Sequence, residues 1–79
     1  TRHLAAELGP HKIRVNALVP GPFPANANAE LAGRLAGRTM LGRLGGAAEI
    51  GGPLLFLAST ASSYMTGAAL NIDGGWTAW

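Results

Sequence analysis

The chain has 79 residues, with six basic and four acidic side chains, a formal net charge of +2 and no cysteine. A chain of this length forms at most one domain and typically buries only about 60% of its unfolded surface, so its stability alone is marginal. The lack of cysteine excludes disulfides and thiolate metal sites. His3 and His11 do not have the spacing of metal ligands, so we expect no metal site.

The remaining composition argues against two kinds of partner. Basic residues are scattered between Arg2 and Arg43 without forming a dense basic face, so we expect no nucleic acid partner. The longest apolar run, residues 54–58, is far shorter than a membrane span, so we expect no membrane partner. No secretory signal is visible, which favours a cytoplasmic location. The chain begins with Thr1 inside a helical pattern, so we expect it to be a piece of a longer protein.

The first third of the chain predicts a helix followed by a strand. Apolar residues recur at helical spacing in residues 1–8, which we interpret as the last two turns of a helix that stops at Gly9 and Pro10. Residues 13–18 are mostly apolar on both faces, as in a strand of a parallel sheet covered by helices. Prolines and a glycine then predict a loop over residues 20–27.

Two helices are predicted in the middle of the chain. Asn28 can cap the first helix, with Glu30 in its first turn, but two internal glycines weaken it. Residues 39–46 are a connector. Residues 47–59 form the most apolar predicted helix, buried on two sides. An interior proline is costly, so this helix alternatively starts at Gly52, with residue 53 in its first turn and residues 47–51 as a separate turn.

The last third predicts one more strand. Residues 59–67 are a polar connector, residues 68–72 are a short apolar strand, and the Asp73 carboxylate is expected to bond backbone amides in the turn that follows. Trp76 and Trp79 expose much apolar area, which favours an interface. The order helix, strand, helix, helix, strand fits a crossover between two parallel strands in an α/β fold.

Common signatures of nucleotide chemistry are missing. No two glycines are separated by a single residue, so the glycine pattern of a dinucleotide cradle cannot occur, and no P-loop is present. Tyr64 has Ala68, and no lysine, four residues later, so we interpret it as a packing residue. No catalytic triad can be argued from the two histidines. Pro20 and Gly21 either simply end a strand or open a crevice at its carboxyl end, where α/β sheets bind ligands.

Several segments together resemble the C-terminal third of a short-chain dehydrogenase/reductase. Each segment is weak alone, and the ordered set is specific to this family. The matching segments are residues 4–22 (LAAELGPHKIRVNALVPGP), 41–45 (LGRLG), 56–59 (FLAS), 62–67 (SSYMTG) and 72–76 (IDGGW).

The resemblance implies a fold and an activity. The fold would be α/β: the C-terminal portion of a doubly wound, Rossmann-type parallel sheet, incomplete, with residues 1–79 as a fragment of one NAD(P)-binding domain. The complete enzyme would use NAD or NADP to transfer hydride to or from a small alcohol or carbonyl substrate, and would be a homodimer or homotetramer. Its catalytic residues would lie upstream, so residues 1–79 contain no catalytic residue and are expected to be inactive alone.

The same resemblance implies four cofactor-binding residues. Pro20 and Gly21 would form the turn beside the nicotinamide ring, and Pro22 and Phe23 would line its carboxamide. Residues 26–39 would form a flexible substrate lid. Residues 47–59 and 70–72 would pair across a dimer axis.

A second hypothesis needs no redox chemistry. The chain would then be a catalytically inactive association module that dimerises through residues 47–59 and the tryptophan tail. In either case, a two-stranded sheet with exposed apolar faces is rarely stable in water, so we expect the isolated chain to fold poorly or to self-associate.

Overall fold

A computed structural model describes residues 1–23 and 28–78 of the chain. The order of helices and strands is the predicted one. The elements are helix α1 (Arg2–Leu8), 3-10 helix η1 (Gly9–His11), strand β1 (Ala17–Pro20), helix α2 (Ala29–Gly37), helix α3 (Ala48–Ala58), 3-10 helix η2 (Thr60–Ser62) and strand β2 (Ala69–Ile72).

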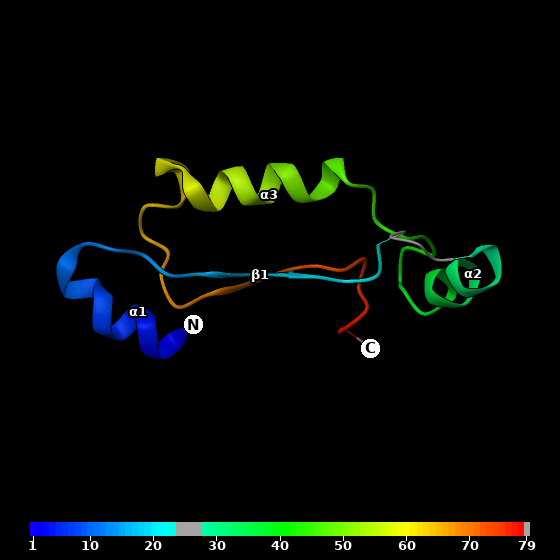
Figure 1. The fold of residues 1–79 in the computed structure, drawn as a ribbon, viewed down its shortest axis with the longest axis horizontal. Coiled ribbons are helices and arrows are strands. Elements are labelled where there is room, and N and C mark those ends of the chain that lie inside the picture. The colour runs from blue at the N-terminus through cyan, green and yellow to red at the C-terminus, as the bar shows by residue number, and fades with distance from the viewer. Residues whose placement is uncertain (24–27, 79) are drawn as a thin grey trace.

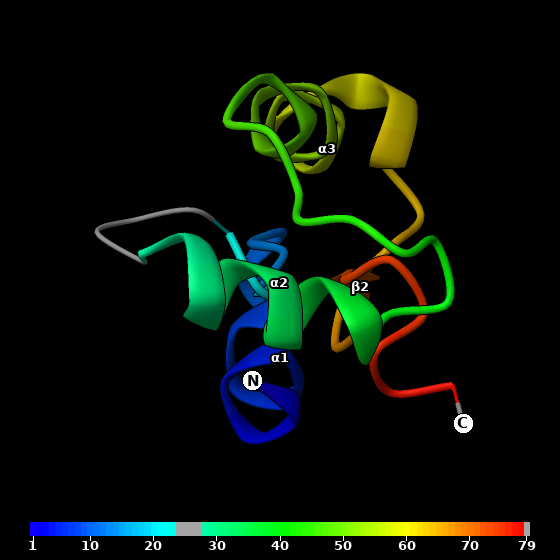
Figure 2. The same cartoon turned by 90° about the vertical axis from the view of Figure 1, so that its right-hand side faces the viewer.

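The two strands form a parallel pair at the centre of the molecule. Leu18 lies opposite Leu70 and Pro20 opposite Ile72, which confirms the predicted parallel sheet. Helix α3 lies along one face of this pair, α1 lies on the other side, and α2 lies beyond the carboxyl end of β1 (Figures 1 and 2). The molecule is elongated, at 48 × 23 × 20 Å. Its radius of gyration is 15.1 Å, against about 12 Å for a compact domain of this length.

Strand β1 differs from the strand predicted over residues 13–18. It begins at Ala17, and the hydrogen bonds before it are mixed. The Gly67 amide still donates to the Val15 carbonyl at 2.8 Å, whereas the Asn16 side-chain amide donates to the Met65 carbonyl and accepts from the Ala68 amide, each at 3.1 Å. It also includes Pro20, which was predicted to begin the loop. The Ala17 amide donates to the Ala68 carbonyl just before β2, and the Gly21 amide donates to the Ile72 carbonyl at its end. Because the donors alternate along the strand, the Pro20 position faces away from β2 and its missing N–H breaks no bond.

The alternative start of α3 at Gly52 is wrong. Helix α3 begins at Ala48 and keeps Pro53 inside. The start signal is Glu49, whose carboxylate accepts a hydrogen bond from the Gly46 amide at 2.9 Å and so satisfies a donor ahead of the helix. The predicted cap of α2 is confirmed, since the Asn28 side chain accepts from the Leu31 amide at 2.8 Å.

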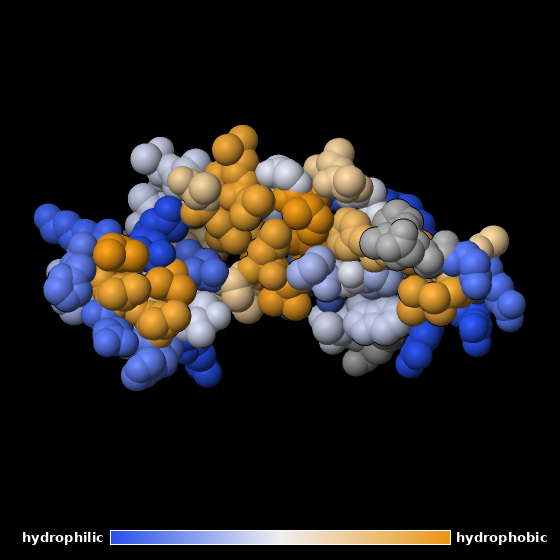
Figure 3. All heavy atoms as spheres, in the orientation of Figure 1, coloured by the Kyte–Doolittle hydropathy of each residue, from blue (hydrophilic) through white to orange (hydrophobic). Residues whose placement is uncertain are grey.

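The described residues bury very little apolar surface. Ala5 is the one apolar residue of the described ranges that is buried. Apolar side chains gather on the surface over α3 and the strands beside it, and again over α1 (Figure 3). On α3, Leu54, Leu55 and Phe56 are 55%, 71% and 38% exposed. Helix α3 therefore packs on the sheet with one side and presents a second apolar side outward.

Candidate cofactor-facing site

The carboxyl ends of the two strands come into direct backbone contact. Gly21 follows β1, and its amide donates to the Ile72 carbonyl at 3.0 Å. A Cβ atom on Gly21 would lie 2.6 Å from the Cα atom of Asp73, the residue after β2. A side chain is therefore sterically excluded at position 21. This edge of a parallel sheet is where open α/β folds bind ligands.

The two residues after Gly21 are held by the segment that leads into α3. The Gly45 amide donates to the Pro22 carbonyl at 3.1 Å. The Phe23 ring lies so close to Gly45 that a Cβ there would be 2.5 Å from the ring atoms Cε1 and Cζ. Gly21, Pro22 and Phe23 are partly buried, whereas Pro20 is exposed.

A small pocket of about 40 Å³ lies beside these residues. It is lined by Pro22, Phe23, Leu41, Arg43, Gly45, Glu49, Ile72, Asp73 and Gly74. Cofactor sites enclose several hundred Å³, so this pocket by itself is too small to enclose a cofactor. The backbone at Gly21 and the apolar groups of Pro22 and Phe23 fit one side of a flat aromatic ring.

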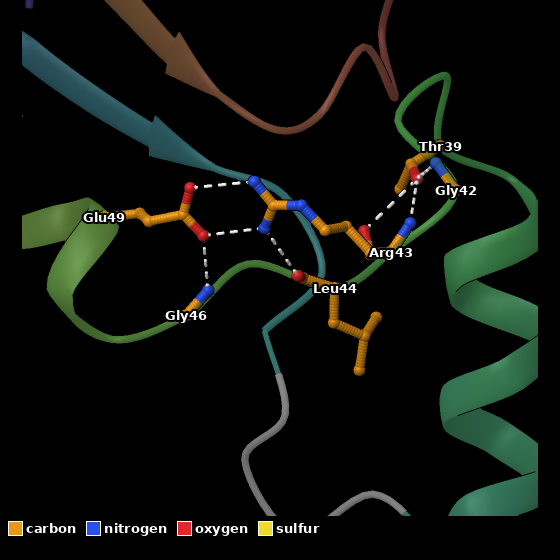
Figure 4. A network of polar contacts seen from close by, with 6 residues as sticks. All are labelled: Thr39, Gly42, Arg43, Leu44, Gly46 and Glu49. Atoms are coloured by element: carbon orange, nitrogen blue, oxygen red, sulfur yellow. Dashed lines mark hydrogen bonds and ion pairs between the residues drawn. The ribbon is translucent and has the colours of Figure 1, made fainter.

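Arg43 and Glu49, which both line this pocket, form an ion pair (Figure 4). The Arg43 guanidinium donates to both carboxylate oxygens of Glu49, from Nη1 to Oε1 at 2.7 Å and from Nη2 to Oε2 at 3.0 Å. These hydrogen bonds, together with the Gly46 amide and the charge of Arg43, lower the pKa of Glu49 to about 2. The hydrogen bonds and the Glu49 charge raise the pKa of Arg43. The segment between Arg43 and Glu49 is thereby fastened to the first turn of α3.

Thr39 anchors the other end of that segment, inside the stretch interpreted as a simple connector. It is only 4% exposed. Its hydroxyl donates to the Ala36 carbonyl at 2.8 Å and accepts from the amides of Gly42 and Arg43 at 2.9 and 3.2 Å. One hydroxyl thus ends α2 and starts the turn that follows. The sequence signal for this anchor was a threonine, Thr39, shortly after Gly37, the last residue of the helix.

The turn after β2 is attached to the end of α2. The Asp73 carboxylate accepts from the amides of Gly75 and Thr77 and from the Thr77 hydroxyl, which confirms the predicted turn. The Thr77 hydroxyl is the main cause of the lowered pKa of Asp73, with the backbone amides adding to it. The Leu41 amide donates to the Gly74 carbonyl at 3.1 Å.

The side chains of Met40 and Arg38 add to the contact between the end of α2 and the turn after β2. Gly75 has φ +88°, and a Cβ there would lie 2.6 Å from Met40 Cβ. The Arg38 guanidinium lies 5.3 Å from the ring centroid of Trp76. The interface predicted for the tail stays a prediction, and Trp79 lies outside the described residues.

Arg14 is the residue that sequence reasoning missed most clearly. Its guanidinium donates five hydrogen bonds of 2.8–3.2 Å, to the carbonyls of Leu57, Ser59, Ser62 and Met65 and to the Ser62 hydroxyl. These acceptors lie at the end of α3 and around η2, where carbonyls lack helical donors. A charged residue among apolar strand residues signals such a partner set.

The interpretation of Tyr64 as a packing residue is wrong for the described residues, because its side chain is fully exposed. Of the predicted lid over residues 26–39, residues 26–27 lie outside the described ranges, and Ala29–Gly37 form α2. Within residues 1–23 and 28–78, no cluster of three or more potential metal ligands occurs, and no helix has the length and hydropathy to cross a membrane.

Comparison with known proteins places the chain in a family. A family model described as enoyl-(acyl carrier protein) reductase matches residues 1–77. The chain therefore belongs to this family of short-chain dehydrogenases/reductases.

Named relatives share both sequence and fold. Galactitol 2-dehydrogenase (L-tagatose-forming) of Cereibacter sphaeroides is 45% identical, with 100% of this chain and 34% of the relative covered. A short-chain dehydrogenase of Leptospira borgpetersenii with bound NAD+ is 40% identical at a TM-score of 0.93, covering 98% of this chain and 30% of its own. A blue fluorescent protein from a metagenomic library, in complex with NADPH, is 38% identical at 0.89, covering 96% and 32%.

These relatives bear on fold and cofactor. The chain spans about a third of the length of the relatives that it matches. The solved relatives confirm the α/β, Rossmann-type fold class, and they hold NAD+ and NADPH, the two cofactors predicted.

Proposed function

We propose that the chain is the C-terminal portion of a single Rossmann domain in an NAD(P)-dependent oxidoreductase, which converts an alcohol to a carbonyl, or the reverse, by hydride transfer. The observation that carries this proposal is the Gly21–Asp73 contact. It brings the carboxyl ends of two parallel strands together beside Pro22 and Phe23, in a chain 40% identical to an NAD+-bound dehydrogenase.

The chain's own residues have positioning roles in this proposal. The bound cofactor supplies the hydride acceptor or donor. Gly21 lets the two strand ends meet, because Asp73 fills the space that a side chain at position 21 would need. The exposed Pro20 and the backbone of Gly21 would then form the sheet edge that the nicotinamide ring approaches. Pro22 and Phe23 cover the carboxamide side and exclude water there. The residues that transfer the substrate's proton lie outside residues 1–79 in this proposal, so this stretch is inactive by itself.

The proposal that the chain is part of a larger sheet has physical support. Among the described residues, β1 has β2 as its one strand partner, and a two-stranded sheet is marginal in water. Apolar side chains such as Ile13 and Leu4 are about half exposed, at 49% and 48%. Each such side chain that stays exposed to water lacks roughly 1.5–3 kcal/mol of stabilisation that its burial would contribute. A larger sheet with further helices would cover them.

We propose a cytoplasmic protein that forms a homodimer or homotetramer.

Two experiments test the proposal. The coding sequence before Thr1 should encode Tyr-x-x-x-Lys about two helical turns upstream, and an in-frame stop or unrelated residues there would contradict the placement. The protein expressed from its complete gene should bind NADH or NADPH, measured by nicotinamide fluorescence, and should oxidise members of a panel of small alcohols and polyols. Phe23→Ala should weaken binding, whereas Phe56→Ala, on α3 and outside the pocket that Phe23 lines, should not.

A second candidate function is association without catalysis. The observation that favours it is the exposed apolar side of α3, where Leu55 is 71% exposed. A second copy of the chain would cover this side. Sedimentation separates the candidates: a stable dimer that ignores NAD(P)H and dissociates in Leu55→Glu supports association alone, whereas cofactor-dependent assembly supports the oxidoreductase.

A further inference from the structure

We propose that Gly45 is a positioning residue for Phe23, and that the Arg43–Glu49 ion pair holds Gly45 in place and so tunes nicotinamide affinity through the Phe23 ring. This inference rests on the proposed function, since Phe23 is taken there as a cofactor-facing residue. It adds a control element, residues 43–49, that acts through the placement of the Phe23 ring.

The first step is the contact between Gly45 and the Phe23 ring. A Cβ on Gly45 would lie 2.5 Å from Cε1 and Cζ and 3.0 Å from Cδ1 of that ring. Real Cβ atoms do not approach carbon this closely, so any side chain at position 45 displaces the ring. The Gly45 amide also fixes the backbone before the ring through its hydrogen bond to the Pro22 carbonyl.

The second step is the fastening of Gly45. Arg43 and Glu49 form a two-point ion pair across Gly45 and Gly46, and the same carboxylate accepts from the Gly46 amide at 2.9 Å. Figure 4 shows Arg43 reaching along the segment toward Glu49 at the start of α3, with Thr39 holding the Arg43 backbone at the other end. The position of Gly45 is therefore set by α3 on one side and by the end of α2 on the other.

The third step is that all these groups border one space. Phe23, Arg43, Gly45 and Glu49 line the same 40 Å³ pocket, together with the strand-end residue Asp73. The Phe23 ring thus lies against Gly45, and the ion pair borders the same pocket. Loss of the ion pair lets residues 43–46 move, the ring then loses its support, and the geometry that a bound nicotinamide would meet is lost.

The test uses the protein expressed from its complete gene, labelled with 4-fluorophenylalanine, with the Phe23 resonance assigned by Phe23→Leu. Gly45→Ala and Glu49→Gln should both shift or broaden the fluorine resonance of Phe23. The matched control is Glu30→Gln, which removes the same charge from the first turn of α2 and should leave that resonance in place. Glu49→Gln keeps the test valid if Gly45→Ala does not fold, because Glu49 lies at the surface.

Cofactor binding supplies the second readout. Gly45→Ala and Glu49→Gln should raise the Kd for NADH or NADPH about tenfold, and KM for the cofactor with it, with kcat changed less than about twofold, since misplacement of a binding wall acts mainly on affinity. In a Phe23→Ala background, Gly45→Ala should no longer change the Kd, because the residue through which it acts is gone.

The outcomes separate this inference from the proposed function. If the wild-type protein binds neither NADH nor NADPH, the proposed function fails, and the fluorine spectra still decide whether Gly45 and Glu49 position Phe23. If the cofactor binds but both variants leave the Phe23 resonance and the Kd unchanged, the inference is wrong. A loss of thermal stability without either change would assign Gly45 and Glu49 a structural role only and would also overturn it.

Discussion

Gly21 and Asp73 meet with no room for an atom between them: a Cβ on Gly21 would lie 2.6 Å from Asp73 Cα and 2.7 Å from its Cβ. These residues directly follow the two strands, so their contact fixes how closely the carboxyl ends of the sheet approach. Phe23 and the Asp73–Thr77 turn are both attached to this point. The contact therefore determines the shape of the edge that we propose faces the cofactor.

Gly21→Ala should force the strand ends apart. Overpacking against backbone costs about 1–3 kcal/mol, so we expect the free energy of unfolding, measured with urea, to fall by that amount, and NADH affinity to fall with it. Gly33→Ala is the matched control, because a Cβ there meets nothing within 4 Å inside α2. The control should stabilise the protein by up to about 1 kcal/mol. Equal effects of the two substitutions would contradict the role given to the contact.

Arg14→Lys should show that the fork shape of the guanidinium is needed, and not its charge alone. Two guanidinium nitrogens of Arg14 donate to carbonyls of α3 and of the turns after it. A lysine ammonium is a single point of donation and cannot reach all of these carbonyls. We expect a loss of about 2 kcal/mol in the free energy of unfolding, since hydrogen bonds to charged donors contribute about that much. Arg34→Lys, on exposed α2, should change it by less than about 0.5 kcal/mol. If Arg14→Lys leaves the free energy of unfolding unchanged, water replaces the lost hydrogen bonds.

Glu49 should give the protein a distinct acid response. Its pKa in the folded protein is lowered to about 2, from an ordinary value of 4.5. A lowered folded pKa means that the stabilisation is fully present above about pH 4.5 and is lost as the pH falls toward 2. The difference in unfolding free energy between wild type and Glu49→Gln should therefore be constant near neutrality and shrink below pH 4.5. Because the pair is exposed, 1 M salt should reduce the difference. A difference that grows toward low pH would contradict the assignment.

The sequence predicted the elements whose signals are local. The Asn28 cap, the Asp73 turn and the apolar strand before it each depend on neighbours within a few residues, and the structure confirms them. Parallel pairing followed from strands that are apolar on both faces. The start of α3 was ambiguous, because the cost of Pro53 outweighed the weaker signal from Glu49, whose partner Arg43 is six residues earlier and lies outside any helical register.

The rest depends on contacts between distant parts of the chain. The apolar neighbours of Arg14 indicate that its charge has partners, but they do not show that these are carbonyls more than forty residues later. Nothing near position 45 shows that its glycine lies under an aromatic ring, or that Gly21 touches Asp73. Glycines in a turn and glycines at a close approach look alike in a single sequence, so the support behind Phe23 could only be found from coordinates.

The attachment of α2 to the turn after β2 leads to the last prediction. Arg38, at the end of α2, lies over the Trp76 ring, and the Leu41 amide bonds the Gly74 carbonyl beside it. An exposed cation–π contact contributes about 0.5–1 kcal/mol, enough to change the opening of a short helix several-fold. Trp76→Leu should therefore speed tryptic cleavage after Arg34 and Arg38 about threefold, whereas Trp76→Phe should retain most of the protection. Cleavage after Arg2, on α1, is the internal reference and should not change. If Trp76→Leu and Trp76→Phe accelerate cleavage equally, the protection comes from the backbone bond at Leu41 and not from the aromatic face.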